Sequence, residues 1–189
     1  MQRGHRVEVV GGLHHVYCRG NQREPIFLDD LDYVALLRRL AKVVERFDWR
    51  CHGFCLMPNH FHLLIETPEP NRGAGMQVLN LSYARWFNWR HRRVGHVFQG
   101  PYGLVHVTRD AHLMELCRYI VLNPVRAGLA PEPGGWPWSS YRATAGLDDV
   151  PAYLSVERIW GFFAAPGSTG ADEFRHFVAA AVASLDLAA

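Results

Sequence analysis

Two histidines separated by one apolar residue are the part of this sequence best suited to chemistry. His60 and His62 flank Phe61 and follow Pro58-Asn59, a dipeptide that favours a tight turn. If a strand follows the turn, alternate side chains share one face, and the two imidazoles lie about 7 Å apart on it. Paired imidazoles on an exposed strand face are typical of metal ligands. The spacing therefore predicts a divalent-metal site on the exposed face of a sheet.

The residue types leave the identity of the metal open. Imidazole suits zinc, whereas magnesium and manganese prefer oxygen ligands, so the residues alone favour zinc or manganese. Asn123 is a third candidate ligand through its side-chain carbonyl, although Asn-Pro can also serve simply to end a helix. Glu66, further along the same strand face as His62, is a weaker candidate. Cys51 and Cys55 lack a second pair to complete a tetrahedral site and are expected to be core residues.

Tyr119 is the candidate nucleophile. It lies four residues before Asn123, so the two share one face of a helix, and Arg126 offers a cation nearby. A phenol has an ordinary pKa near 10 and needs help from a metal or a base before it can attack phosphorus. The alternative is a core aromatic between Leu116 and Leu122. A metal and a phenol together could cut a phosphodiester.

Charge is distributed unevenly although the formal net charge is only +2. No acidic residue lies between Glu69 and Asp110, an interval rich in arginine and interleaved with Trp86 and Trp89. Such a stretch indicates a nucleic-acid partner, with a solvated helix face as the alternative. A second donor-rich segment follows the first expected strand. The predicted DNA contacts are Arg19, Asn21, Arg23, Arg85, Arg90, Arg92, Arg93 and Arg126.

Periodicity predicts an α+β fold. Strands are expected at 13–19, 50–57, 61–66 and 103–108, and helices at 30–47, 76–92 and 110–123. Pro124 should end the last helix at Asn123, because a residue before proline disfavours helical geometry. The order β-α-β-β-α-β is the ferredoxin-like split βαβ arrangement, an antiparallel sheet backed by two helices. The helix that carries the tyrosine follows the fourth strand.

Length and composition are those of one catalytic domain with an extension. We expect the domain to span residues 1–145 and an Ala-rich, weakly acidic extension to span 146–189. Trp136 and Trp138, near the end of the domain, could stack on bases or clamp the core. No apolar run approaches the roughly 20 residues that cross a bilayer, and the first ten residues do not form a secretory signal. A cytoplasmic protein without a membrane partner is expected.

Four ordered blocks of the sequence carry a family resemblance. They are Tyr17 to Asn21, Cys55 to Leu64, Arg118 to Leu129 and Trp136 to Tyr141. Together these blocks resemble the single-tyrosine HUH transposases, and most of all the REP-associated tyrosine transposases. The resemblance implies a site-specific single-strand DNA endonuclease and strand-transferase that acts at DNA hairpins. Tyr119 would form a 5′-phosphotyrosine, and the metal would be Mg²⁺ or Mn²⁺ with substrate phosphates as hard ligands.

The resemblance also leaves alternatives open. The insertion-sequence relatives often have glutamine four residues after the tyrosine, and Asn123 is one methylene shorter. Those relatives dimerise and share the tyrosine helix between subunits, whereas REP-associated relatives can act as monomers, so either a monomer or a homodimer is expected. A non-catalytic module that binds hairpin DNA or RNA on the same scaffold is the alternative function. A hydrolase that uses activated water would form no covalent adduct.

Overall fold

The computed structural model describes residues 8–163 and 167–186 of the 189-residue chain. Its centre is one antiparallel sheet in the order β2-β3-β1-β4. The strands are β1 (Gly12–Arg19), β2 (Arg50–Met57), β3 (His60–Thr67) and β4 (Gly103–Val107). The predicted ferredoxin-like arrangement is confirmed, with β1 and β3 as the central pair. The start of β3 and the end of β1 therefore meet at one end of the sheet.

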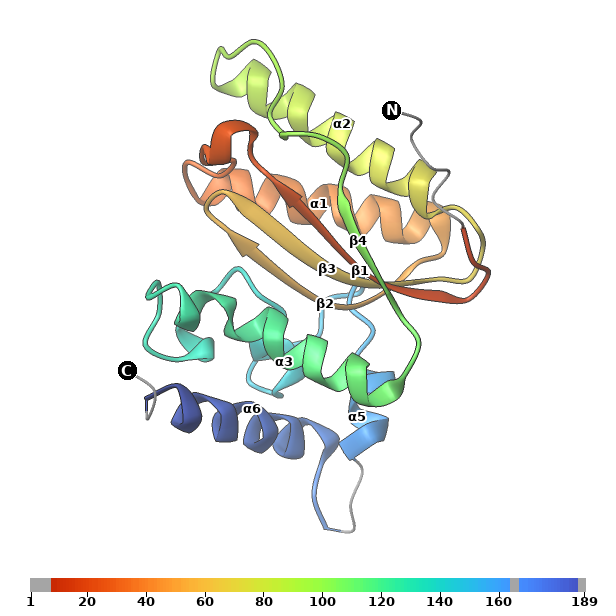
Figure 1. Cartoon of the computed structure of the whole chain (residues 1–189), viewed down its shortest axis with the longest axis vertical. Helices are drawn as coiled ribbons and strands as arrows, with labels where there is room; N and C mark the ends of the chain where they lie inside the picture. The colour runs from red at the N-terminus through yellow and green to blue at the C-terminus, as the bar shows by residue number, and fades with distance from the viewer. Residues whose placement is uncertain (1–7, 164–166, 187–189) are drawn as a thin grey trace.

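Helices cover both faces of this sheet (Figure 1). α1 (Asp30–Phe47) and α2 (Arg72–Arg90) lie on one face, and α3 (Asp110–Arg126) crosses the other. α6 (Gly170–Asp186) packs outside α3, and α5 (Glu157–Phe163) packs against α6. The remaining helical turns are η1 (Asn21–Arg23), η2 (Pro133–Gly135) and α4 (Tyr141–Thr144). Among the described residues, no helix is long and apolar enough to span a membrane.

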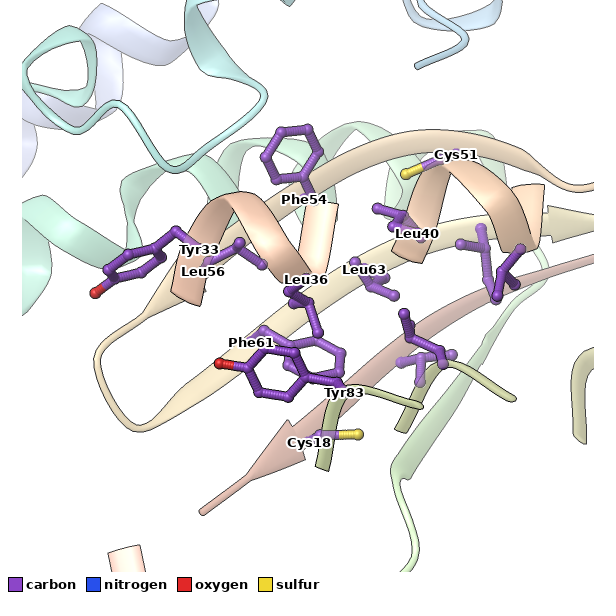
Figure 2. Packing of buried hydrophobic residues seen from close by; sticks show 14 of the residues in the cluster. Cys18, Tyr33, Leu36, Leu40, Cys51, Phe54, Leu56, Phe61, Leu63 and Tyr83 are labelled. Carbon is purple, nitrogen blue, oxygen red and sulfur yellow. The ribbon is translucent and has the colours of Figure 1, made fainter. Parts of the chain in front are cut away.

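The larger part of the core lies between the sheet and α1 and α2. The Asp29 carboxylate caps α1 by accepting a hydrogen bond from a first-turn N–H. Apolar residues at helical spacing then face the sheet, and Figure 2 shows Leu36 and Leu40 packed over Phe61 and Leu63 of β3. All four side chains are fully buried. Their burial fixes the register of β3 and turns its alternate residues, among them His60 and His62, toward α3.

The α3 face of the sheet is buried as well, contrary to the expectation of an exposed histidine face. Leu64 of β3 joins Cys117 and Ile120 of α3 in a second hydrophobic cluster, which α6 closes with Phe174 and Val178. His62 is only 7% exposed to solvent. The helix that carries the tyrosine, α3, covers this face of the sheet, because its apolar side must pack on the sheet. The predicted exposure was therefore wrong for His62, whereas His60 is only partly buried.

Two helix boundaries differ from the expected ones. α3 continues through Pro124 to Arg126 rather than stopping at Asn123. Proline has no N–H to donate, and the side-chain amide of Asn123 supplies a hydrogen to the Ile120 carbonyl instead, 3.3 Å away. α2 begins at Arg72 instead of 76. Gly75 in its first turns leaves room for the Trp49 ring, since a Cβ there would lie 2.1 Å from that ring.

Residues beyond 146 pack on the preceding part of the chain. Ile159 and Phe174 belong to the α3 cluster, and the Ser155 N–H donates to the Cys51 carbonyl. Arg158 also reaches Glu66, whose carboxylate is bound by Arg50, His52 and Arg158. Glu66 is thus occupied by a structural charge network. The division at residue 145 stays a prediction.

The two tryptophans of the 131–138 loop act as a clamp. The Trp136 indole N–H donates to the Leu56 carbonyl at 2.9 Å, and the Trp138 ring stacks on Tyr33 with centroids 4.6 Å apart. Both rings therefore fasten the loop to the sheet and α1. Of the two alternatives left open by the sequence, these contacts favour the clamp over base stacking.

Candidate active site

The two histidines of β3 lie side by side at the start of the strand. Their ring centroids are 5.1 Å apart and their planes nearly perpendicular, at 86°. On the neighbouring strand β1, Arg19 is opposite His60 and Tyr17 is opposite His62. The antiparallel pairing of the two central strands therefore brings a guanidinium and a phenol to the histidine pair.

Each histidine uses Nδ1 for a hydrogen bond within the protein. His60 Nδ1 lies 2.7 Å from Asn59 Oδ1, and His62 Nδ1 lies 2.9 Å from His15 Nε2. Asn59 donates its amide N–H to the Arg23 carbonyl, so its Oδ1 faces His60 as an acceptor. The neutral His60 ring must then carry its hydrogen on Nδ1, and its Nε2 has a free lone pair. This arrangement fits a metal ligand whose second nitrogen is fixed by a hydrogen bond.

Both rings are held in the neutral form. Burial, together with the Arg19 guanidinium, lowers the pKa of His60 from 6.5 to about 4. Burial also lowers the pKa of His62 to about 3, with further contributions from His15, His60 and Arg19. A metal binds neutral imidazole, so protons would compete little with a metal for these two histidines near pH 7.

Tyr119 projects from α3 beside this pair. Its ring meets the His62 ring edge-on at 5.9 Å between centroids and the His15 ring at 6.3 Å. The side chain is 38% exposed, so a substrate can approach the phenol. The Arg126 guanidinium lies 5.2 Å from the centre of the tyrosine ring. The candidate nucleophile, the two histidines and a cation are therefore brought together within one chain.

Asn123 is one turn beyond Tyr119, but its amide is used within the helix. Nδ2 donates to the Tyr119 carbonyl at 2.9 Å as well as to the Ile120 carbonyl. Within residues 8–163 and 167–186, no three His, Cys, Asp or Glu side chains are grouped to hold a metal by themselves. An ion at His60 and His62 would therefore take further donors from Asn123 Oδ1 or from substrate phosphates. The ligand role of Asn123 stays a prediction.

The donor-rich loop after β1 is fastened to the turn before His60. The Gly20 N–H donates to the Asn59 carbonyl at 2.8 Å, and Asn59 in turn bonds the carbonyl of Arg23. Gly20 is required here because a Cβ would lie 2.1 Å from the Glu24 carbonyl oxygen. Arg19, Asn21 and Arg23 consequently lie beside the histidines, in the loop where DNA contacts are expected.

The four arginines near the end of α2 lie in the opposite layer. Arg90 forms ion pairs with Asp29 and Asp32, and Arg93 pairs with Glu24. Arg85 and Arg92 are exposed, and no ion pair is recorded for either in the described part of the chain. The geometry thus separates two arginines used in intramolecular ion pairs from two that are open to a ligand.

A groove of about 500 Å³ runs along α2 beside the segment that follows it. Gln77, Asn80, Arg85, Asn88 and His96 supply polar groups, and no carboxylate lines the groove. The same segment leads back to the site, since the Gln99 N–H donates to the Arg19 carbonyl and the Asn21 N–H to the Val97 carbonyl. A groove without carboxylates therefore lies next to the start of the loop after β1.

Sequence reasoning missed His15, Tyr17 and Asn59. The Tyr17 ring lies across Gly103 of β4, where a Cβ would be 2.0 Å from the ring. The available signal was the alternation of His15 and Tyr17 on a strand that pairs with β3. Since His14 and His15 are adjacent, that signal does not say which histidine faces the site; His14 instead contacts Arg72 and His106 on the other face.

Comparison with known proteins shows which proteins this chain resembles. The model of a family described as IS200-like transposases matches residues 9–123. A protein of Haemophilus influenzae that carries the name REP-associated tyrosine transposase is 26% identical over 164 residues, covering 80% of this chain and 88% of that protein. The solved structure of a REP-associated tyrosine transposase bound to a REP hairpin superposes with a TM-score of 0.66 at 17% identity, covering 82% and 92% of the two chains.

Proposed function

Because the chain belongs to the IS200-like transposase family, we propose that it cuts and rejoins single-stranded DNA beside a hairpin through a covalent bond to Tyr119. The observation that carries this proposal is the contact of Tyr119 with the His62 ring, 5.9 Å between centroids, with Tyr119 itself 38% exposed to solvent. The hairpin bound by the structural relative supports the choice of substrate.

The reaction is a transesterification. The Tyr119 oxygen attacks the scissile phosphorus, an O–P bond to tyrosine forms, and the bond from phosphorus to the 3′ oxygen breaks. The phenol loses its proton and the departing 3′ oxygen gains one, so no water or external energy source is consumed. Attack by another 3′-hydroxyl on the phosphotyrosine reverses the step and joins strands.

The protein groups divide this work between them. His60 and His62 would hold a divalent cation, Mg²⁺ or Mn²⁺, through their Nε2 atoms, because both Nδ1 atoms are already hydrogen-bonded. When bound, such an ion supplies a Lewis acid that offsets charge on the phosphate. Arg126, packed on the Tyr119 ring, adds a cation on the side of the nucleophile. Arg19, opposite His60, adds another at the end of β1.

We infer that the DNA follows the surface from this site to the α2 groove. Arg19, Asn21 and Arg23 border the histidines. Backbone hydrogen bonds join this loop to residues 97–99, and Val97 and Phe98 line the groove together with Arg85. Phosphates position a nucleic acid while base edges specify it, and the groove offers guanidinium and amide groups for both tasks. Arg92 extends the cationic surface at the end of α2.

A nicking assay tests the function. The probe is a pool of synthetic DNA hairpins with randomised single-stranded flanks, incubated with the protein and Mn²⁺. We expect cleavage in a flank that leaves a 3′-hydroxyl, which a polymerase extends, and a 5′ end blocked by protein. Tyr119→Phe should bind the same hairpins without cutting. Products with a free 5′-phosphate, formed equally well by Tyr119→Phe, would indicate a water-using hydrolase instead.

A further inference from the structure

His15 lies behind the candidate metal ligands, on a different strand. We propose that His15 is a positioning residue that holds His62 in the tautomer with hydrogen on Nδ1, which leaves Nε2 free to bind a cation. The inference rests on the proposed function, because it concerns the metal site of that reaction.

The contact between the two rings is close and buried. His15 Nε2 lies 2.9 Å from His62 Nδ1, and the ring centroids are 5.1 Å apart with the planes 24° from parallel. His15 is 5% exposed and His62 is 7% exposed, so water does not readily replace this hydrogen bond. The two strands are paired along their whole length, which fixes the position of both rings.

A hydrogen bond of this kind contains one hydrogen, so its direction determines the tautomer. If His15 donates from Nε2, His62 must accept on Nδ1 and carries its own hydrogen on Nε2, where it blocks the metal. If His62 donates from Nδ1, its Nε2 has a free lone pair. Only the second arrangement matches His60, which the Asn59 oxygen already holds with hydrogen on Nδ1. His15 would thus do for His62 what Asn59 does for His60.

The acceptor in this pair is a neutral imidazole rather than a carboxylate. Partners that hydrogen-bond a ligating histidine orient its ring and tune its basicity, and their loss typically lowers metal affinity about 10- to 100-fold. Replacing His15 by leucine would leave the buried Nδ1–H of His62 without its acceptor and free the ring to change tautomer. Glutamine at position 15 can present its Oε1 near the place of Nε2 and should restore acceptance.

The first test is spectroscopic and uses the full-length, metal-free protein. Long-range ¹H–¹⁵N correlation spectra of histidine side chains report which ring nitrogen carries hydrogen. We expect His62 to have hydrogen on Nδ1 in the wild type and in His15→Gln, and to lose this preference in His15→Leu. His14→Gln, a change at the buried neighbour on the opposite face of β1, is the matched control and should leave His62 unchanged. Hydrogen on Nε2 of His62 in the wild type would overturn the proposal.

The second test measures Mn²⁺ binding by electron paramagnetic resonance without DNA cleavage. His15→Leu should bind Mn²⁺ about 10- to 100-fold more weakly than the wild type, and His15→Gln should recover most of that loss. Equal affinities in all three proteins would refute the positioning role. If His15→Leu does not fold, the tautomer seen in the wild-type spectrum and the Mn²⁺ affinity of His15→Gln still test the positioning role. A wild type that binds Mn²⁺ with the expected tautomer but never forms an adduct would contradict the proposed function alone.

Discussion

The ring of Tyr119 meets the ring of His62 edge-on, 5.9 Å between centroids, and both belong to the same chain. The proposed nucleophile is therefore within reach of the histidines of its own molecule. Because α3 is packed between the sheet and α6, it is held over its own site. This geometry leads to a prediction about subunits that does not depend on the oligomeric state.

A mixture of two inactive variants should stay inactive. Tyr119→Phe lacks the proposed nucleophile and His62→Ala lacks a proposed metal ligand, and a site built within one chain cannot combine the intact half of each. We expect no cleavage when the purified variants are mixed at equal concentration, measured as nicked hairpin on a denaturing gel. Recovery of up to one quarter of wild-type activity would instead mean that a partner molecule supplies the tyrosine helix.

The two histidine substitutions should differ in stability but agree in activity. Both His60→Ala and His62→Ala should abolish metal-dependent cleavage. His62→Ala should also lower the free energy of unfolding by about 1–3 kcal/mol, because it leaves buried His15 without its partner. His60→Ala should lower the free energy of unfolding by less, because His60 is only partly buried. Urea unfolding of the metal-free proteins measures the difference.

Asn123→Ala is expected to be milder in cleavage than either histidine variant. The substitution also removes the amide that bonds the Ile120 carbonyl at the proline turn of α3, so some stability should be lost. Cleavage rates titrated with Mn²⁺ separate the two effects, since loss of a ligand shifts the metal requirement and fraying of the helix end does not.

The arginines of α2 should divide into two groups. Arg85→Ala with Arg92→Ala should weaken binding to every hairpin and flatten the slope of log affinity against log salt by about one to two units. Arg90→Ala should instead lower the melting temperature, because it removes the guanidinium bound to fully buried Asp32. Arg38→Ala, an exposed arginine on α1, is the matched control. Equal salt slopes for the double variant and the wild type would direct the DNA path away from α2.

As the pH is lowered, the metal-free protein should begin to lose stability at a higher pH than the titration of carboxylates alone would produce. Burial lowers the pKa of His14, His15 and His60 to about 4 and that of His62 to about 3. Below pH 6.5 the unfolded chain takes up protons that the folded chain refuses, so stability is complete above pH 6.5 and falls as the pH approaches 4. The limiting slope is about 1.4 kcal/mol per pH unit for each histidine held neutral.

Denaturant unfolding at pH 7.5, 6.5 and 5.5 in the presence of a chelator measures this loss. His14→Gln removes one of the four groups without touching the candidate metal ligands, so its stability should decline less steeply. A wild-type free energy of unfolding that stays constant from pH 7.5 to 5.5 would show that these histidines protonate freely in the folded protein.

The sheet and its helices could be predicted because each signal was local. Apolar residues alternate along β3, and the stripe of α1 follows a capping aspartate, so both elements can be recognised within a few residues. The end of α3 could not be predicted, because a proline such as Pro124 usually stops a helix. The side-chain hydrogen bond from Asn123 to the Ile120 carbonyl, which accompanies its continuation, is visible only in the structure.

The site was predictable in part for the same reason. His60, His62 and Tyr119 lie in short motifs, whereas His15 is recognisable only once β1 is paired with β3 and its facing side is known. The ion pairs of Arg90 with Asp29 and Asp32 likewise join segments far apart in the sequence. An acid-free stretch of sequence therefore contained arginines already matched with carboxylates from elsewhere.

Mass spectrometry of the protein after reaction with hairpin DNA and Mn²⁺ tests the central claim most directly. Denaturation, nuclease digestion and proteolysis should yield the Tyr119 peptide with a nucleotide bound to its phenol. The adduct should be absent from Tyr119→Phe and present in Tyr17→Phe, which removes the other phenol next to His62. Hairpin cleavage without any protein-bound nucleotide, or with the nucleotide on a residue other than Tyr119, would contradict this account.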